Sequence, residues 1–171
     1  MRNLFYNIGV FDSYVITKKS ICVGNLSVGG TGKTPLVDLI AHHFIENKIQ
    51  IATLSRGYGR TTKGLIEVNE NSLAINVGDE PLLYKSKYGE NIKVVVAEKR
   101  KSGVEYIQST YPNNELIILD DAFQHRAVKA GFNILVTDYS NLFVNDFLLP
   151  AGNLREPISA IKRADVIVVS K

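Results

Sequence analysis

Short apolar runs alternate with helix-like stretches along most of the chain. The clearest runs are apolar at nearly every position: Ile92–Ala97, Leu116–Leu119, Phe132–Val136 and Val166–Val169. Continuous apolar runs are typical of strands that are buried on both faces, as in parallel sheets covered by helices. The pattern therefore predicts an α/β fold with a mostly parallel sheet and helices on both faces, of the doubly wound kind.

Weaker signals predict the remaining elements. Further strands are expected at Ser20–Val23 and Ile51–Leu54, and a hairpin is expected from Leu65–Val68 and Leu73–Val77. Helices are expected at Thr34–Asn47, Asp79–Tyr88, Lys101–Tyr111 and Ile158–Arg163. Asp79 is the expected N-cap of its helix, because Pro81 follows within the first turn.

The N-terminal segment Leu4–Ile16 mixes large apolar side chains with Asn, Asp and Ser. This composition fits a strand or helix packed on the domain, and it also fits an interfacial segment resting on a membrane. No stretch approaches the roughly 18 apolar residues of a membrane-spanning helix. The first residues also lack the basic and apolar regions of a signal peptide.

Composition narrows the class of protein. The 171 residues are 45% hydrophobic and 22% charged, which indicates one globular domain. A net charge of +3 does not favour nucleic acid as a partner, although it suits an anionic small substrate or a membrane surface. The single cysteine, Cys22, lies in an apolar run, so we expect a small core residue and a reducing compartment.

A glycine-rich loop between the first strand and the first helix carries the strongest chemical signal. It matches the phosphate-binding pattern G-x-x-x-x-G-K-[ST] through Ser27, Val28, Gly29, Gly30, Thr31, Gly32, Lys33 and Thr34. Only the first position departs, because serine stands there in place of glycine. Such a loop points backbone amides at phosphate oxygens at a helix N-terminus. Lys33 is then the cation on the β- and γ-phosphates, and the Thr34 hydroxyl a magnesium ligand. The alternative is a structural glycine turn, which the strand–loop–helix context disfavours.

A second acidic element is expected to complete a magnesium site. Asp120 and Asp121 directly follow the apolar strand Leu116–Leu119. Aspartates often end strands for purely structural reasons, but together with a phosphate loop they fit a magnesium role. The pattern does not decide which of the two contacts the metal.

These residues, with four further blocks, resemble the tetraacyldisaccharide 4′-kinase (lipid A 4′-kinase) family. The resembling blocks are Val23–Pro35, Ser55–Arg60, Val77–Pro81, Leu119–Arg126 and Leu149–Pro157. The family also has a non-glycine residue at the Ser27 position, whereas Ala122 stands where the family usually has glycine. The resemblance reaches from about residue 2 to the end of the chain.

The resemblance implies a P-loop kinase that uses ATP and Mg²⁺. It would phosphorylate the 4′-hydroxyl of tetraacyldisaccharide 1-phosphate, giving lipid IVA in lipid A biosynthesis, at the cytoplasmic face of the bacterial inner membrane as a peripheral protein. Residues 1–19 would be a remnant of the family's membrane-associating segment. Residues 20–171 would be the N-terminal lobe, and the C-terminal lobe would lie beyond Lys171.

The resemblance also implies roles for individual residues. Asp79 matches the position that the family uses near the attacking hydroxyl, where a carboxylate orients the hydroxyl or accepts its proton. Lys33 is the second catalytic group. Substrate-contacting or supporting roles are expected for Glu80, Arg100, Gln124, His125, Arg155 and Glu156. Arg56 and Arg60 fit either an anionic sugar headgroup or a solvated basic loop.

Two other functions remain open from the sequence. One is a different phosphate-loop class, such as a partition-type ATPase or a metallochaperone-type GTPase. Those proteins often carry lysine just before the paired glycines, where this chain has Val28. The other is a fragment that binds nucleotide without transferring phosphate, since the resemblance covers only the N-terminal part of the family.

Overall fold

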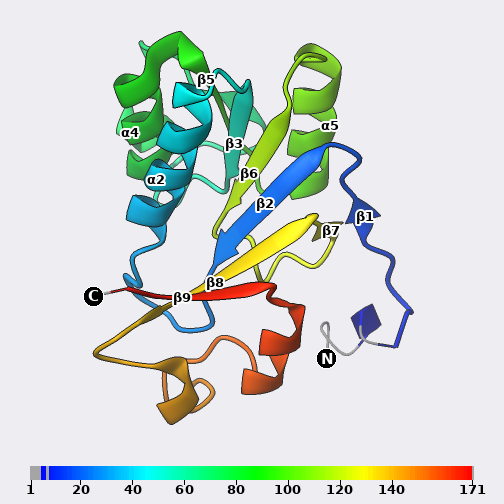
Figure 1. Cartoon of the computed structure of the whole chain (residues 1–171), viewed down its shortest axis with the longest axis vertical. Helices are drawn as coiled ribbons and strands as arrows, with labels where there is room; N and C mark the ends of the chain where they lie inside the picture. The colour runs from blue at the N-terminus through cyan, green and yellow to red at the C-terminus, as the bar shows by residue number, and fades with distance from the viewer. Residues whose placement is uncertain (1–4, 7, 171) are drawn as a thin grey trace.

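A single large sheet organises the chain. The computed structural model describes residues 5–6 and 8–170. The sheet has seven strands in the order β4-β5-β3-β6-β2-β8-β9 (Figure 1). In chain order they are β2 (Lys19–Gly24), β3 (Ile51–Ser55), β4 (Ile66–Glu67), β5 (Ile92–Val96), β6 (Leu116–Asp120), β8 (Phe132–Asp138) and β9 (Val166–Ser170). Every neighbouring pair is parallel except β4–β5, which confirms the predicted fold class.

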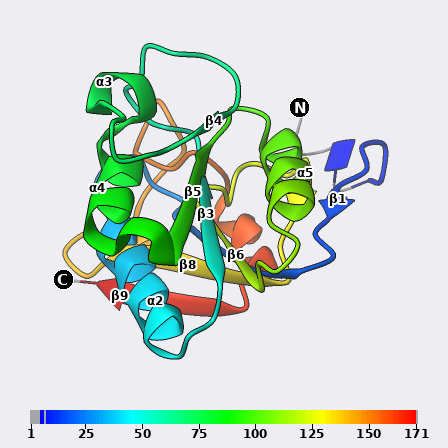
Figure 2. The same ribbon diagram turned by 90° about the horizontal axis from the view of Figure 1, so that it is seen from above.

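Helices cover both faces of this sheet. Helices α2 (Lys33–Glu46) and α4 (Asp79–Tyr88) pack on one face. Helix α5 (Arg100–Thr110) and the 3₁₀ helix η3 (Ile158–Arg163) pack on the other (Figures 1 and 2). Because β5, β3, β6, β2, β8 and β9 all run parallel, the loops at their carboxyl ends gather at one edge of the sheet.

Strand β6 shows why a strand in this sheet is apolar at successive positions. Leu116 and Ile118 belong to the core beneath α2 and α4, and Ile117 and Leu119 to the core beneath α5. Successive side chains of a strand point to opposite faces, so both faces need apolar residues. Cys22 on β2 is buried in the α5 core, as expected for a small core residue.

The predicted hairpin is wrong in its second half. Strand β4 does pair antiparallel with β5, but Ala74–Val77 forms the short helix α3. The amides of Val77 and Gly78 bond to the carbonyls four residues earlier, at Leu73 and Ala74, and not to a neighbouring strand. The side chains of Leu73 and Ile75 are exposed, so no buried face holds this segment extended.

The predicted N-cap at Asp79 is also wrong by one residue. Gly78 takes the cap position with φ +95°, and Asp79 is the first residue of α4. No side chain caps this helix. A carboxylate in the first turn still interacts favourably with the positive end of the helix.

The N-terminal part forms a small separate ribbon. Strand β1 (Tyr14–Val15) pairs in parallel with β7 (Val128–Lys129), which supports the expectation that this segment packs on the domain. Leu4 and Asn7 of the predicted segment lie outside the described residues. Within residues 5–6 and 8–170, no helix combines the length and apolarity needed to cross a membrane.

Candidate active site

The glycine-rich loop connects β2 to α2 at the carboxyl edge of the sheet. Gly29 and Gly32 have φ of +104° and +79°, which glycine adopts without strain. A Cβ added to Gly29 or Gly30 would meet nothing within 4 Å, so open space lies beside the backbone of the loop. Helix α2 begins at Lys33, and its free amides point toward the same space. This geometry suits an anion.

Neighbouring segments hold the loop in place. Asn25 Nδ2 donates to Thr31 Oγ1 at 2.8 Å, and Ser170 Oγ donates to the Thr31 carbonyl at 2.8 Å. Ser27, at the departing first position, is buried and forms an isolated bridge with Leu154. A buried, bridged residue at this position has no need of the backbone freedom of glycine, which accounts for the departure from the pattern.

The two aspartates lie next to this loop because β6 pairs directly with β2. Val23 is in register with Asp120, so the ends of both strands meet. Lys33 Nζ lies 3.6 Å from Asp121 Oδ1. Asp121 has a φ of +47°, an uncommon conformation for a residue with a side chain. The lysine of the loop and the acidic turn therefore form one site.

Asp120 and Asp121 differ in their surroundings. Burial of Asp120, together with the negative charge of Glu80, raises the pKa of its carboxyl to about 7. For Asp121, burial would raise the pKa, but hydrogen bonds from Arg155 and the charge of Lys33 hold it below its usual range. Asp120 thus carries a carboxylate whose charge is poorly compensated by the protein, as expected where a cation is to bind.

Helix α4 connects the loop to the aspartates. Glu80 accepts a hydrogen bond from Thr34 Oγ1 at 2.5 Å, and Asp120 accepts one from Tyr84 at 3.1 Å. Glu80 and Tyr84 are four residues apart and so lie on the same face of the helix. Asp79 begins α4 beside Glu80, and its side chain is exposed at the carboxyl edge of the sheet.

The basic loop after β3 packs against the start of α4. A Cβ on Gly78 would lie 2.9 Å from the Tyr58 carbonyl, so only glycine permits this approach. The loop lines a cavity of about 640 Å³ with Arg56 and Arg60 among its walls. Arg60 Nη2 donates hydrogen bonds to Glu98 Oε1 at 2.5 Å and to the Gly64 carbonyl at 2.7 Å. The side chain of Arg56, by contrast, is exposed.

Arg155 and Glu156 point in different directions. Arg155 Nη2 lies 3.0 Å from Asp121 Oδ1 and also donates to Asn25 Oδ1, which places Arg155 on the acidic turn. Glu156 is 3% exposed, and its carboxylate pairs with Arg163. The burial of Glu156 favours a supporting role over contact with a substrate, whereas Arg155 lies directly on Asp121.

Arg100, Gln124 and His125 surround the same turn. Arg100 is 3% exposed and donates from Nη1 to the Ala97 carbonyl at 2.5 Å. Burial lowers the pKa of Arg100 to about 10, against the raising effect of the Asp121 and Asp120 charges. Gln124 Nε2 donates to the Asn25 carbonyl at 2.6 Å, and His125 is partly buried, with its amide bonded to the Ala122 carbonyl. Arg100 forms no ion pair with Glu80 in the described part of the chain.

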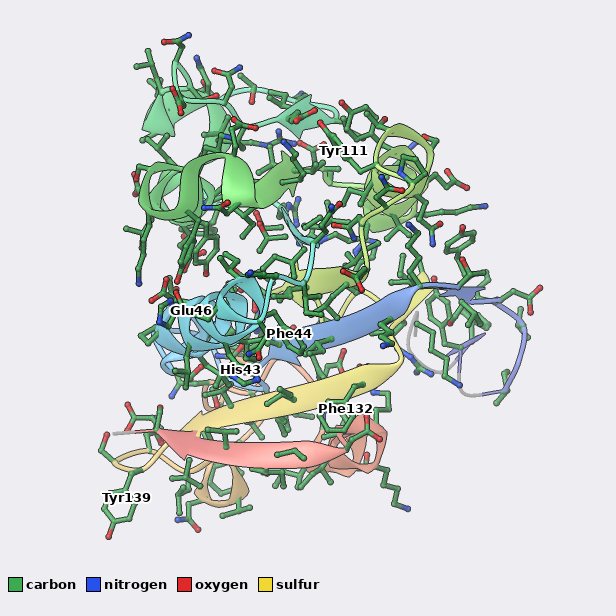
Figure 3. The ribbon with its side chains drawn as sticks, turned by 45° about the horizontal axis from the view of Figure 1, so that its top comes forward. His43, Phe44, Glu46, Tyr111, Phe132 and Tyr139 are labelled. Atoms are coloured by element: carbon green, nitrogen blue, oxygen red, sulfur yellow. The ribbon has the colours of Figure 1, made fainter. Side chains whose placement is uncertain are left out.

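The other histidines lie away from this site. His42 and His43 are exposed on α2, and Figure 3 shows His43 beside Phe44 and Glu46 in the C-terminal half of that helix. Over residues 5–6 and 8–170, no three His, Cys, Asp or Glu side chains cluster closely enough to hold a metal by themselves. A magnesium ion would need the Thr34 hydroxyl and phosphate oxygens as further ligands, which is how this ion is commonly bound.

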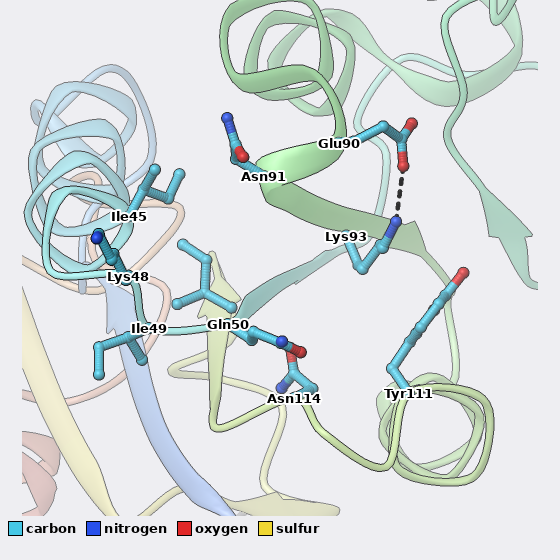
Figure 4. A pocket seen from close by; sticks show the side chains of 10 residues that line it. Ile45, Lys48, Ile49, Gln50, Glu90, Asn91, Lys93, Tyr111 and Asn114 are labelled. Atoms are coloured by element: carbon cyan, nitrogen blue, oxygen red, sulfur yellow. Dashed lines mark hydrogen bonds and ion pairs between the residues drawn. The ribbon is translucent and has the colours of Figure 1, made fainter.

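A second cavity, of about 440 Å³, lies at the opposite edge of the sheet (Figure 4). Ile51 and Lys93, at the amino ends of β3 and β5, are among its lining residues. Lys93 bonds to Glu90 at 2.7 Å within it. Ligands of open α/β sheets bind at the carboxyl ends of the strands, so this cavity is not the candidate active site.

Sequence reasoning missed three residues of the site. Tyr84 and Arg163 carry no motif, although Tyr84 lies one helical turn after Glu80 and that spacing is readable. Asn25 lies inside the block Val23–Pro35, but its contacts with Thr31 and Arg155 depend on the fold.

Comparisons with known proteins agree with this geometry. The family model described as tetraacyldisaccharide-1-P 4′-kinase matches residues 1–171. Tetraacyldisaccharide 4′-kinase of Flavobacterium psychrophilum is 52% identical over the whole chain, which covers 49% of that protein. The Bacteroides fragilis enzyme of the same name is 46% identical, with 45% of its length covered.

A solved structure is similar over nearly the whole chain. The crystal structure of LpxK from Aquifex aeolicus in complex with ATP has a TM-score of 0.86 and 39% identity. The similarity covers 99% of this chain and 53% of that one. The present chain thus spans about half the length of the relatives it matches. The family expected from the sequence blocks is confirmed: the chain belongs to the tetraacyldisaccharide-1-phosphate 4′-kinase family.

Proposed function

We propose that the protein containing this chain transfers the γ-phosphoryl group of ATP to the 4′-hydroxyl of a tetraacyldisaccharide 1-phosphate, giving lipid IVA. The observation that carries the proposal is the contact between Lys33 Nζ and Asp121 Oδ1, which are 3.6 Å apart. The contact lies beside a glycine-rich loop with open space next to its backbone. Relatives named for this reaction, and a similar structure that holds ATP, support it.

On the donor side, the loop from Ser27 to Thr34 binds the phosphates through its backbone amides. When nucleotide binds, Lys33 either gives up its contact with Asp121 or keeps it while also contacting the nucleotide. In both cases its charge neutralises the β- and γ-phosphate oxygens. Arg155 keeps Asp121 ionised and oriented when the lysine turns to the nucleotide. The charge that develops during transfer then meets groups already in place, which is the main source of catalysis in phosphoryl transfer.

The oxygen donors at this site fit Mg²⁺. Thr34, Asp120 and Asp121 would hold the ion together with the phosphates, because Mg²⁺ prefers hard oxygen ligands. The ion would supply charge neutralisation for the transferred phosphoryl group. The desolvated carboxyl of Asp120, with its pKa raised to about 7, is the observation that favours a cation here.

On the acceptor side, we assign Asp79 to the attacking hydroxyl. Its side chain is exposed at the start of α4, next to Glu80, which contacts Thr34. A carboxylate there orients the hydroxyl and receives its proton. The cavity beside it, with exposed Arg56, suits an anionic sugar headgroup.

We also propose that the part of the N-terminal segment that precedes β1 rests on the cytoplasmic surface of the inner membrane. Ile8, Val10 and Phe11 are 61%, 59% and 45% exposed. Large apolar side chains exposed together favour an interfacial position, where they enter the boundary of the lipid headgroups.

One assay tests the reaction. The full-length protein is incubated with γ-labelled ATP, Mg²⁺ and tetraacyldisaccharide 1-phosphate, and label in the lipid is measured. We expect transfer by the wild type and its loss in Lys33→Ala, with Lys101→Ala, on the exposed face of α5, as the matched control. Label released only as inorganic phosphate, or stimulated by another acceptor, would overturn the proposal.

A further inference from the structure

The acidic turn after β6 contacts a partly buried ion pair between Arg163 and Glu156, whose side chains are 27% and 4% exposed. Arg163, at the end of η3, donates from Nη1 to the Phe123 carbonyl at 2.7 Å. Its guanidinium also lies over the Phe123 ring, 4.3 Å from the centroid. Its second nitrogen, Nη2, pairs with Glu156, whose side chain is 4% exposed. One planar side chain thus joins the acidic turn to the segment of Arg155 and Glu156.

The turn that it holds needs such support. Asp121 adopts a positive φ that costs energy for a residue with a side chain, and surroundings must maintain it. Phe123, two residues later, packs so closely on β2 that a Cβ at Gly24 would lie 2.5 Å from its own. The position of Phe123 therefore fixes both the acidic turn and the strand end that leads into the phosphate loop.

The two neighbours Arg155 and Glu156 have different partners. Arg155 pairs with Asp121, which also lies near Lys33, whereas Glu156 pairs with Arg163. The Oε1 atom of Glu156 has no hydrogen-bond partner within the described residues. Among the described residues, Arg163 is therefore the charged partner of Glu156, the residue next to Arg155.

We propose that Arg163 is a positioning residue of the phosphate-transfer site, which sets the acidic turn and Arg155 relative to Lys33 through Phe123 and Glu156. The proposal deepens the kinase function proposed above and rests on it. Arg163 does not touch the nucleotide; it acts by fixing the groups that do.

The experiment separates positioning from folding in the full-length protein. Arg163→Met leaves Glu156 buried without its partner, so it should lower both stability and affinity for Mg²⁺–ATP. The double variant Glu156→Leu with Arg163→Met removes both charges. We expect it to regain much of the thermal stability, yet to keep an affinity about tenfold or more below the wild type, as found when supporting groups are lost.

Two further variants complete the set. Arg163→Lys keeps a charge for Glu156, but it lacks the planar fork that also reaches Phe123, so stability should stay near normal while affinity remains reduced. Lys162→Met, on the exposed side of η3, is the control and should change neither quantity.

Affinity is measured by titration calorimetry with Mg²⁺–ATP, without the lipid acceptor, and stability by thermal melting. Wild-type affinity in Arg163→Met, or recovery of affinity together with stability in the double variant, would overturn the proposal. Because the binding arm needs no lipid, failure of lipid phosphorylation by the wild type would remove the proposed function while leaving the result for Arg163 readable.

Discussion

Tyr84 donates its phenol hydroxyl to Asp120 Oδ2 at 3.1 Å, and the two side chains lie buried together between α4 and β6. One turn earlier on the same helix, Glu80 accepts a hydrogen bond from Thr34 of the phosphate loop. Helix α4 therefore touches both halves of the proposed metal site and carries Asp79 at its start. The proposed donor and acceptor groups are thus linked through one helix.

Removal of the Tyr84 hydroxyl should weaken binding of Mg²⁺. In Tyr84→Phe, Asp120 loses a buried donor that orients its carboxylate, and this hydrogen bond also lowers its pKa. We expect a loss of about 1–3 kcal/mol in the free energy of unfolding and an increase of roughly tenfold in the Mg²⁺ concentration for half-maximal ATP binding. Binding of a fluorescent ATP analogue across a Mg²⁺ titration measures the second effect.

Tyr88→Phe is the matched control. Tyr88 lies one turn further along α4 and donates to Asp38 Oδ1 at 2.8 Å, away from the acidic turn. Asp38 also keeps its contact with Lys87, so the variant should leave the Mg²⁺ titration unchanged. An equal change in both variants would mean that α4 acts only through general stability.

The free energy of unfolding of the metal-free protein should decrease as pH rises, because Asp120 becomes ionised in a buried position. The pKa of this carboxyl is about 7 in the folded chain, above its ordinary value of 3.8, so folding favours the protonated acid. Between about pH 4 and pH 7 the unfolded chain ionises first, and stability falls as pH rises through this range. Above pH 7 the full penalty is present.

Asp120→Asn should therefore stabilise the metal-free protein at pH 8 and much less at pH 5. The gain is at most about 4 kcal/mol, since one pKa unit corresponds to about 1.4 kcal/mol. Thermal melting with a chelator at both pH values measures it. The same variant should lose the added stability that Mg²⁺–ATP gives to the wild type. A melting difference that does not depend on pH would contradict the raised pKa.

Gly24 should tolerate no side chain. A Cβ there would lie 2.5 Å from Phe123 Cβ and 3.1 Å from the Phe123 amide nitrogen, so Gly24→Ala must displace the acidic turn. We expect a destabilisation of about 1–3 kcal/mol, measured by urea unfolding, together with weaker nucleotide binding.

Gly131→Ala provides the comparison, because its nearest neighbour would be 3.5 Å away, an ordinary contact distance. Its stability and affinity should remain close to those of the wild type. If Gly24→Ala binds Mg²⁺–ATP normally despite lower stability, then moving Phe123 does not disturb the nucleotide site, and the prediction is wrong.

Asp79→Asn should affect turnover and leave ATP binding intact. Asp79 forms no hydrogen bond with the loop in the described structure, whereas its neighbour Glu80 does. We expect kcat for lipid phosphorylation by the full-length protein to fall by about 10²–10⁴, with an unchanged dissociation constant for Mg²⁺–ATP. A large loss of ATP affinity would place Asp79 on the donor side instead.

The sheet and most helices could be predicted because burial on both faces leaves a direct trace in the sequence. The apolar run before Asp120 is an example, since both cores need it. The segment Leu73–Val77 shows where this fails. Its apolar residues alternate as in a strand, but β4 covers the free edge of β5 only briefly, and the chain coils into α3.

The candidate site could be predicted wherever its residues stand in contiguous blocks, as in the loop that ends with Lys33 and Thr34. Contacts between distant segments leave no such trace. Arg155 and Glu156 are neighbours in one block, yet Arg155 pairs with Asp121 of the acidic turn, whereas Glu156 is buried against Arg163. Only the path of the backbone decides which of two adjacent side chains faces the ligand.

The pairing of the phosphate loop with a distant segment also affects biosynthesis. The Val28 amide bonds to the Asn153 carbonyl at 2.9 Å, and the Arg155 amide to the Leu26 carbonyl at 2.7 Å. A growing chain on the ribosome cannot form these contacts until that later segment has left the exit tunnel, because contacts between distant residues must await both partners. The backbone contacts that brace the phosphate loop are thus completed only after residues 153–155 have been synthesised.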